Sequence, residues 1–131
     1  MKVERHKASI RQKEIVAQYL HELDKHLADL KSGNAEHTFE IKDLAELLFI
    51  HPKHLSNTIQ EVLGKSPCDI YEARLIEISK ELLLTTNKPI SHIAQTLTYD
   101  PSNFTKFFKS YEGITPKKFR ELNSKTELLT N

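Results

Sequence analysis

The chain has little cysteine, few glycines and no long apolar run, and each shortage excludes a class of protein. The single cysteine, Cys68, cannot form an internal disulfide and fits a reducing compartment. The three glycines stand far apart, so there is no glycine-rich loop to cradle a phosphate group. No apolar stretch approaches the roughly 18 residues of a membrane span, and the N-terminus lacks the apolar core of a secretory signal. These features predict a cytoplasmic protein without a membrane partner.

Catalytic and metal-binding patterns are also missing. Residues 21–26, HELDKH, begin and end with histidine, and this spacing of i and i+5 fails the i, i+4 rule for a zinc-binding helix. No nucleophile stands in a recognisable pattern with its base. We therefore expect no enzyme, no catalytic residue, no metal and no cofactor. Cys68 follows Pro67 at a predicted helix start, where we expect a small buried side chain, although a helix N-terminus can lower the pKa of a thiol.

The feature that the chain does contain is an internal repeat. A constant offset of 49 residues (94 − 45 and 113 − 64) places residues 41–67 on residues 90–116 without a gap. The matched pairs include Ile41 and Ile90, Leu44 and Ile93, Ala45 and Ala94, Leu48 and Leu97, Pro52 and Pro101, and Gly64 and Gly113.

Each copy predicts two short helices joined by a tight turn. Residues 90–97 carry apolar side chains at i, i+3, i+4 and i+7, which is one stripe of an amphipathic helix. The alanine in this stripe is small enough to let a second helix cross closely. That second helix begins at a proline after a capping residue, as His51-Pro52 or Asp100-Pro101, and ends near a glycine. Two such pairs are typical of a tandem helix-turn-helix.

Further helices are predicted around the two copies. Residues 9–32 have Ser9 as N-cap, Gly33-Asn34 as stop, and an apolar stripe. The stripe consists of Val16, Leu20, Leu23, Leu27 and Leu30. We expect it to pack on the first copy; the alternative is a dimer seam, or a junction to an upstream domain, in its N-terminal half. Residues 69–85 predict a central helix of roughly 25 Å, and the residues after Arg120 a short final helix that frays.

Positive charge is concentrated near the C-terminal end of the chain. The net charge of +1 is weak support for a nucleic-acid partner. Residues 102–120, however, oppose a single acid, Glu112, with five bases, which are Lys106, Lys109, Lys117, Lys118 and Arg120. This part of the chain is therefore suited to meet an anion.

The second copy and the helix before it resemble the DNA-binding domain of the AraC/XylS family of bacterial transcription regulators. The matching positions are Arg74-Leu75, Ser79, Leu82-Leu83, Thr86, Ile90, Ile93-Ala94, Phe104, Phe108-Lys109, Gly113, Thr115-Pro116 and Phe119-Arg120. The resemblance extends from about residue 39 to residue 122. It implies a C-terminal DNA-binding domain of seven helices, in which two recognition helices enter successive major grooves of double-stranded DNA, with RNA polymerase nearby.

The predicted fold is therefore all-α, with tandem helix-turn-helix units joined by a long central helix and an extra N-terminal helix. We divide the chain into an N-terminal helix and linker (1–36), the DNA-binding domain (37–123) and a flexible tail (124–131). The leading hypothesis is a sequence-specific DNA-binding transcription regulator, acting as a monomer or as a dimer through the N-terminal helix. The alternative is a protein-interaction module derived from such a domain, with weakened DNA binding.

The chain departs from the family pattern at two places. Thr98-Tyr99 stands where the family usually has Gly-Phe, and this turn is one residue shorter than the common pattern. Because a left-handed residue other than glycine costs about 1–2 kcal/mol, we expect the turn to take a different path and to tilt the second recognition helix. Asn57 stands where many relatives carry arginine, which would lower affinity for the DNA backbone or change the base that is read.

Candidate DNA contacts follow from the outward positions of the two recognition helices. Asn and Gln can pair with an adenine edge, so Asn57 and Gln60 are the main candidate base readers. The full base-reading set is Lys53, Ser56, Asn57, Gln60, Ser102, Asn103 and Lys106. The candidate phosphate contacts are Thr105, Lys109, Lys117, Lys118 and Arg120, and Arg120 has a rival role, pairing with an internal carboxylate. A plain solvated face is the alternative for any single member. Phe104, Phe107, Phe108 and Tyr111 are expected to point inward.

Overall fold

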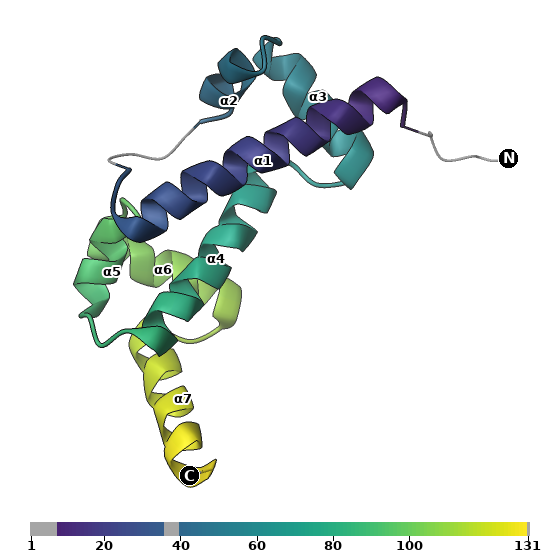
Figure 1. Ribbon diagram of the computed structural model, residues 1–131. Coiled ribbons are helices and arrows are strands. Elements are labelled where there is room, and N and C mark those ends of the chain that lie inside the picture. The colour runs from purple at the N-terminus through teal and green to yellow at the C-terminus, as the bar shows by residue number, and fades with distance from the viewer. Residues whose placement is uncertain (1–7, 36–39, 131) are drawn as a thin grey trace, which may run out of the picture. The chain divides into compact units, whose positions relative to one another are not determined.

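The computed structural model describes residues 8–35 and 40–130, with side chains up to residue 124. These residues form helices and no strand, so the predicted all-α class is confirmed. In chain order the helices are α1 (Ile10–Ser32), α2 (Ile41–Leu47), α3 (Pro52–Leu63), α4 (Pro67–Thr85), α5 (Ile90–Thr96), α6 (Pro101–Glu112) and α7 (Pro116–Thr130) (Figure 1). None of the described helices is both long enough and apolar enough to span a bilayer.

The chain folds as two compact units. Among the described residues, the first unit takes 8–29 and 40–72, and the second takes 30–35 and 73–130. The first unit therefore holds most of α1, all of α2 and α3, and the first residues of α4. The second holds the last residues of α1, the rest of α4, and α5 to α7. Each unit thus contains one of the two predicted helix-turn-helix pairs.

Helix α1 begins and ends where the sequence predicts. The Gln12 backbone amide donates to Ser9 Oγ at 3.0 Å, and the Ser9 amide donates to Gln12 Oε1 at 3.0 Å, which is a reciprocal capping box. At the other end Gly33 takes a φ of 85°, which suits glycine after a helix. Four of the five predicted apolar positions are buried, Leu20 is half-buried, and Ile15, Tyr19 and His26 are buried as well. The buried face is therefore broader than the predicted stripe.

The two helix-turn-helix turns have the same backbone geometry. Phe49 has a φ of 60° and Thr98, 49 positions later (98 − 49), has a φ of 65°. The next amide in each copy donates back to the buried alanine carbonyl, from Ile50 to Ala45 at 3.0 Å and from Tyr99 to Ala94 at 2.8 Å. The second turn therefore follows the same path as the first, and the predicted departure from the family's path, with the tilt of α6, stays a prediction. Thr98 itself adopts the left-handed conformation, so the conformational strain is borne by this residue and the backbone path of the first turn is retained.

Apolar side chains of each pair are buried beneath its second helix. Ala45 and Ala94 are fully buried, as a close crossing requires. The buried positions around them are Leu44, Leu55, Thr58 and Ile59 in the first unit, and Ile93, Leu97, Phe104 and Phe108 in the second. Of the four aromatics expected inside, only Phe104 and Phe108 are buried. Phe107 is half-buried and stacks on Tyr99 with ring centroids 5.0 Å apart, and Tyr111 is 43% exposed.

Helices α4 and α7 are longer than predicted. Helix α4 starts at Pro67, where Ser66 Oγ accepts from the Asp69 amide at 3.1 Å. Cys68 is exposed, so the expected buried filler is wrong. Partial burial, with the carboxylates of Glu72 and Asp69, raises the pKa of its thiol, which contradicts a lowering by the helix N-terminus. Helix α7 extends to Thr130 and has 15 residues, so it is longer than the short final helix that was predicted. The domain boundaries and the flexibility of the tail stay predictions.

Candidate nucleic-acid interface

Helix α3 displays the first group of predicted base readers. His51 caps the helix, since its Nδ1 accepts from the Lys53 amide at 3.1 Å, and Pro52 occupies the first turn. The side chains that face inward are buried, as described above. On the opposite face Lys53, Asn57 and Gln60 are exposed and Ser56 is half-buried. The helix therefore presents two amide side chains to solvent, and these can donate and accept hydrogen bonds together.

Helix α6 has the same construction with a stronger cap. The Asp100 carboxylate accepts from the amides of Ser102 at 3.1 Å and Asn103 at 3.3 Å, and from Ser102 Oγ at 2.6 Å. The Ser102 hydroxyl bond, followed by the Asn103 amide, lowers the pKa of Asp100. Ser102, Asn103 and Lys106 are exposed, and Thr105 is half-buried. Because the Ser102 hydroxyl proton is used by the cap, this residue can offer a base only an acceptor.

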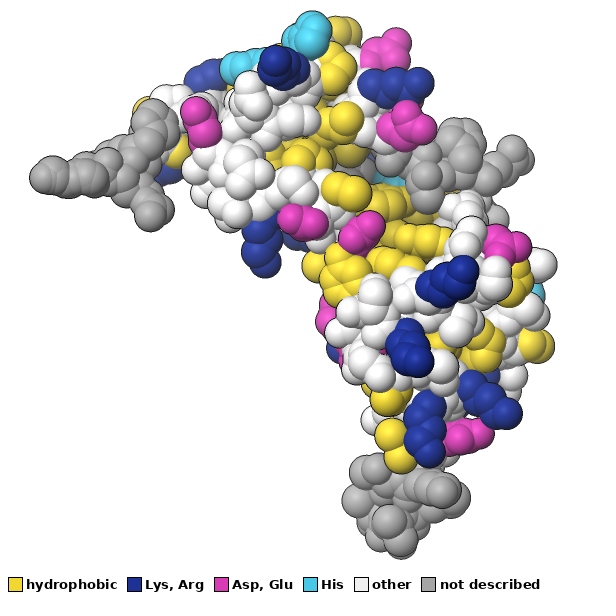
Figure 2. Space-filling view, turned by 180° about the vertical axis from the view of Figure 1, so that it is seen from behind, with side chains coloured by type: hydrophobic (Ala, Val, Ile, Leu, Met, Phe, Trp, Pro, Cys, Tyr) yellow, Lys and Arg dark blue, Asp and Glu magenta, His cyan; other side chains and the backbone are white. Residues whose placement is uncertain are grey.

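Exposed lysines lie in the last turn of α6 and the first turn of α7. Lys109 lies on the last turn of α6, and Lys117 and Lys118 lie on the first turns of α7. The Lys118 amide donates to Thr115 Oγ1 at 3.1 Å, and this bond caps the N-terminus of α7. The cap fixes where α7 begins and so places Lys117 and Lys118 in its first turn. Figure 2 shows Lys and Arg side chains standing out from the surface. Exposed cationic side chains of this kind suit phosphate groups.

Arg120 differs from the other candidate phosphate contacts. Its Nε donates to the Leu83 carbonyl at 3.0 Å, its Nη1 to the Lys88 carbonyl at 2.7 Å and its Nη2 to the Thr86 carbonyl at 3.2 Å. The guanidinium therefore ties α7 to the end of α4 and the segment that follows. The rival structural role predicted for Arg120 fits this geometry, but with backbone carbonyls as partners in place of a carboxylate.

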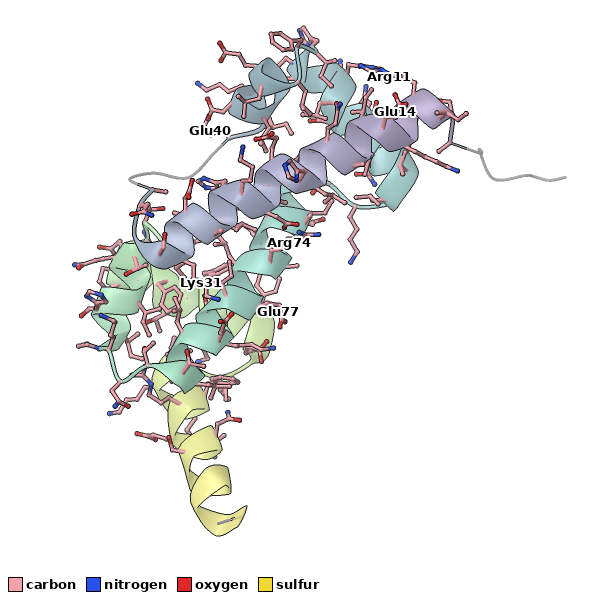
Figure 3. All side chains as sticks on the ribbon, in the orientation of Figure 1. Arg11, Glu14, Lys31, Glu40, Arg74 and Glu77 are labelled. Atoms are coloured by element: carbon pink, nitrogen blue, oxygen red, sulfur yellow. The ribbon has the colours of Figure 1, made fainter. Side chains whose placement is uncertain are left out.

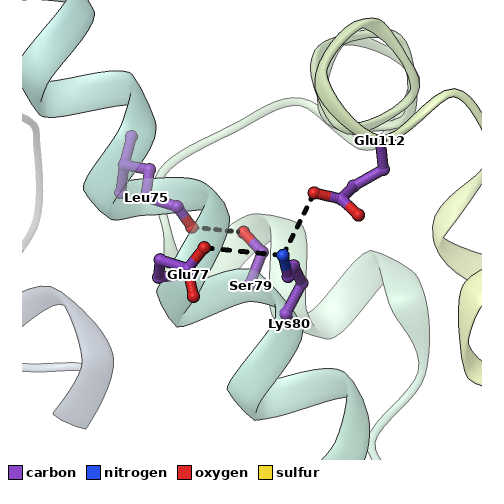
Figure 4. Close-up of polar contacts among 5 residues, drawn as sticks. All are labelled: Leu75, Glu77, Ser79, Lys80 and Glu112. Carbon is purple, nitrogen blue, oxygen red and sulfur yellow. Dashed lines mark hydrogen bonds and ion pairs between the residues drawn. The ribbon is translucent and has the colours of Figure 1, made fainter.

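Two polar bridges that no local pattern predicts also bear on the site. In the second unit, Lys80 Nζ lies 3.2 Å from Glu112 Oε2 and 3.4 Å from Glu77 Oε2 (Figure 4). This contact joins α4 to the last residue of α6, and the hydrogen bond with Glu112 raises the pKa of Lys80. In the first unit, Gln12 Nε2 donates to Glu61 Oε1 at 2.6 Å, joining α1 to α3. Glu77 is a neighbour of Lys80 on α4, but Glu112 lies 32 positions from Lys80 and Glu61 lies 49 positions from Gln12, so periodicity carries no signal of these two pairs.

A helix-turn-helix domain model matches residues 44–122, more than half of the chain. The chain belongs to the AraC/XylS family. This AraC/XylS chain is 37% identical over 86 residues to the uncharacterized HTH-type transcriptional regulator YisR of Bacillus subtilis (strain 168), covering 65% of the chain and 30% of YisR. It is 31% identical over 87 residues to the arabinose operon regulatory protein of Escherichia coli (strain K12), covering 66% and 30%.

A solved structure supports the same fold. The C-terminal domain of AraT, a response regulator from Geobacillus stearothermophilus, gives a TM-score of 0.72 at 29% identity, covering 82% of the AraC/XylS chain and 84% of that domain. The chain spans about a third of the length of the two curated relatives described above. Among the described residues of the AraC/XylS chain, no group of three or more His, Cys, Asp or Glu side chains is placed to hold a metal ion.

Proposed function

We propose that the protein is a sequence-specific DNA-binding transcription regulator in which α3 and α6 are the recognition helices. The observation that carries the proposal is that two helices with the same turn and cap geometry each expose a polar face, in a chain of the AraC/XylS family. Major grooves admit a helix of this kind. We further propose that the two helices enter successive major grooves of one duplex.

Base reading is assigned to the exposed polar side chains of these helices. Asn57 and Gln60 are the main readers in the first unit, with Lys53 and the half-buried Ser56 beside them. In the second unit Asn103 and Lys106 are proposed to reach base edges. Ser102 is the weakest member, because its proton is held by Asp100.

Phosphate contact is assigned to Lys109, Lys117, Lys118 and the half-buried Thr105. Such contacts fix the position of the protein on the duplex and carry no sequence information directly. Arg120 is omitted from the proposal, because three carbonyl oxygens already engage its guanidinium.

The test separates the two classes of contact. Bound sequences are first selected from a random duplex pool, which shows whether two half-sites exist and how far apart they lie. Lys109→Ala is then expected to weaken binding to all sequences alike and to reduce the salt slope by about one charge, whereas Asn57→Ala relaxes sequence preference. Equal losses on every sequence in both variants would contradict the roles. Absence of binding near roughly micromolar protein at low salt would contradict the function itself and support a protein-interaction module.

The remaining parts of the proposal concern the setting of this activity. A DNA-binding regulator without catalytic residues acts on transcription in the cytoplasm, and the family implies RNA polymerase as its protein partner there. We propose no enzymatic activity. The chain binds as a monomer or as a dimer through α1. Cross-linking between the chain and purified polymerase on promoter DNA tests the polymerase contact, and no cross-link above a promoter-free control would contradict it.

A further inference from the structure

Phe49 is an outlier in both conformation and exposure. Its φ of 60° lies in the left-handed region, where side chains other than glycine are disfavoured. Its side chain is 93% exposed, so the ring packs against almost nothing in its own unit. Strained residues and exposed apolar side chains both concentrate at binding surfaces. A partner outside the unit would explain both the conformation and the exposure of Phe49.

The second copy of the repeat shows that the turn does not need this ring. Thr98 occupies the equivalent position with a φ of 65° and is half-buried. The backbone hydrogen bonds of the two turns match, as described above. The turn thus requires a left-handed residue at this place, but neither an aromatic nor an exposed one. The ring of Phe49 is explained by something other than the local fold.

A groove lies beside Phe49 in the first unit. It has a volume of about 530 Å³, and its apolar lining residues are Ala17, Leu47, Leu48 and Phe49 itself. Leu47 is itself 48% exposed, which adds to the apolar surface around Phe49. Arg11 and Glu22, both on α1, line the same groove. The surface therefore combines a projecting aromatic ring with a recess lined by both apolar and polar side chains, including charges of both signs.

We propose that this groove together with Phe49, here called the Phe49 surface, binds a second copy of the chain. Under two-fold symmetry the same patch serves both copies, so each Phe49 enters the groove of the other. A groove beside a projecting ring is suited to such an exchange. The surface shares no residue with the proposed DNA contacts, so failure of this inference leaves the proposed base and phosphate contacts untouched. It makes specific the dimer through α1 that is part of the proposed function.

The charges in the groove favour a second copy over an unrelated partner. Arg11 and Glu22 lie 11 positions apart (22 − 11), which is roughly 16 Å along α1. If two α1 helices cross antiparallel near Ala17, Arg11 of each faces Glu22 of the other. Arg11 pairs with Glu14 at 3.6 Å (Figure 3), and Glu22 pairs with Lys25 at 3.7 Å. Each of these pairs joins neighbours on one helix, and three of the four side chains are largely exposed, so the pairs are weak enough to rearrange.

The first experiment measures the mass of the 131-residue chain by sedimentation equilibrium over a range of concentrations. Phe49→Thr introduces the residue that the second copy carries in the same conformation, so the turn is retained. Leu84→Ala is the matched control, because Leu84 is 49% exposed and lies outside the groove. We expect the wild-type chain and Leu84→Ala to dimerise alike, and Phe49→Thr to dimerise roughly 100-fold more weakly, since two rings lose their burial per dimer.

A charge reversal tests the antiparallel arrangement. Arg11→Glu and Glu22→Arg are each expected to weaken the dimer, and the double variant to restore it. Circular dichroism of every variant confirms that the helices remain. A wild-type chain that is monomeric at roughly 100 µM would overturn the inference, because even weak dimers form at that concentration. So would a Phe49→Thr dimer as tight as wild type, or capture of a different protein by a chain that stays monomeric alone.

Discussion

Replacement of Arg120 by alanine is expected to destabilise the second unit strongly. The guanidinium donates to three backbone carbonyls, at Leu83, Thr86 and Lys88, and two of these three bonds are partly buried. A hydrogen bond from a charged donor contributes about 1.5–3 kcal/mol when buried. With the Lys88 bond exposed and the side chain half-buried, we expect a loss of about 3 kcal/mol in the free energy of unfolding. For a chain of this size that corresponds to a fall of about 10 °C in Tm.

Arg120→Lys separates the charge from the geometry. A lysine ammonium keeps a positive charge near the C-terminal end of α4, where the interaction with the helix dipole stabilises the fold by about 0.3–1 kcal/mol. It cannot reach three carbonyls with the planar fork of arginine. We therefore expect Arg120→Lys to recover less than half of the lost stability. Lys118→Ala, a change at an exposed neighbour, is the control and should stay within about 0.5 kcal/mol of wild type.

Urea unfolding followed by far-UV circular dichroism measures these differences. A loss below about 1 kcal/mol for Arg120→Ala, or a lysine variant as stable as wild type, would refute the reasoning from the three carbonyls. DNA binding gives a second readout under conditions where the variants remain folded. A structural Arg120 leaves the salt slope of binding unchanged, whereas a phosphate contact would reduce it by about one charge.

Three further predictions follow from the second unit. Thr98→Gly should raise the free energy of unfolding by about 1 kcal/mol. The change relieves the left-handed strain and removes a buried Oγ1 that has no hydrogen-bond partner among the described residues. A urea midpoint lower than that of wild type would contradict this. Asp100→Asn should lower Tm near neutral pH. Since the pKa of Asp100 lies below its ordinary value of 3.8, its carboxylate stabilises the fold above that pH, and the difference from Asn should vanish as pH falls through the lowered pKa; a difference that persists in acid would count against the cap. Lys80→Glu should cost about 0.5 kcal/mol. Lys80→Glu with Glu112→Lys should regain part of this loss, because Glu77 then faces a like charge, as a double-mutant cycle in urea would show.

The sequence predicted the parts of the fold that depend on local patterns. The 49-residue offset gave both helix-turn-helix pairs, because the same apolar spacing, proline and glycine recur in each copy. Ser9 and Gly33 gave the ends of α1, since a cap and a left-handed stop are chosen within a few residues of the helix. Such features need no knowledge of distant parts of the chain.

Sequence and structure differ at places where one local rule competes with the rest of the structure. Glycine is the usual left-handed residue, yet Thr98 accepts that conformation because the turn is fixed by hydrogen bonds on either side. Four aromatics at helical spacing suggested one buried stripe, but α6 buries only a narrow strip, and Tyr111 lies at its edge. The partners of Arg120 are backbone carbonyls more than thirty positions away, and a residue pattern does not record carbonyls. The roles of the proposed DNA contacts stay predictions.

The division of α1 between the two units has a consequence for synthesis on the ribosome. The last residues of α1 belong to the second unit, and one of them, Lys31, forms an ion pair with Glu81 of that unit. Chains emerge N-terminus first, so domains fold in that order. The first unit has all its residues once position 72 has left the exit tunnel, whereas the final turn of α1 must wait for α4 and α5. We therefore expect a nascent chain stalled shortly after the first unit to resist protease except at this turn.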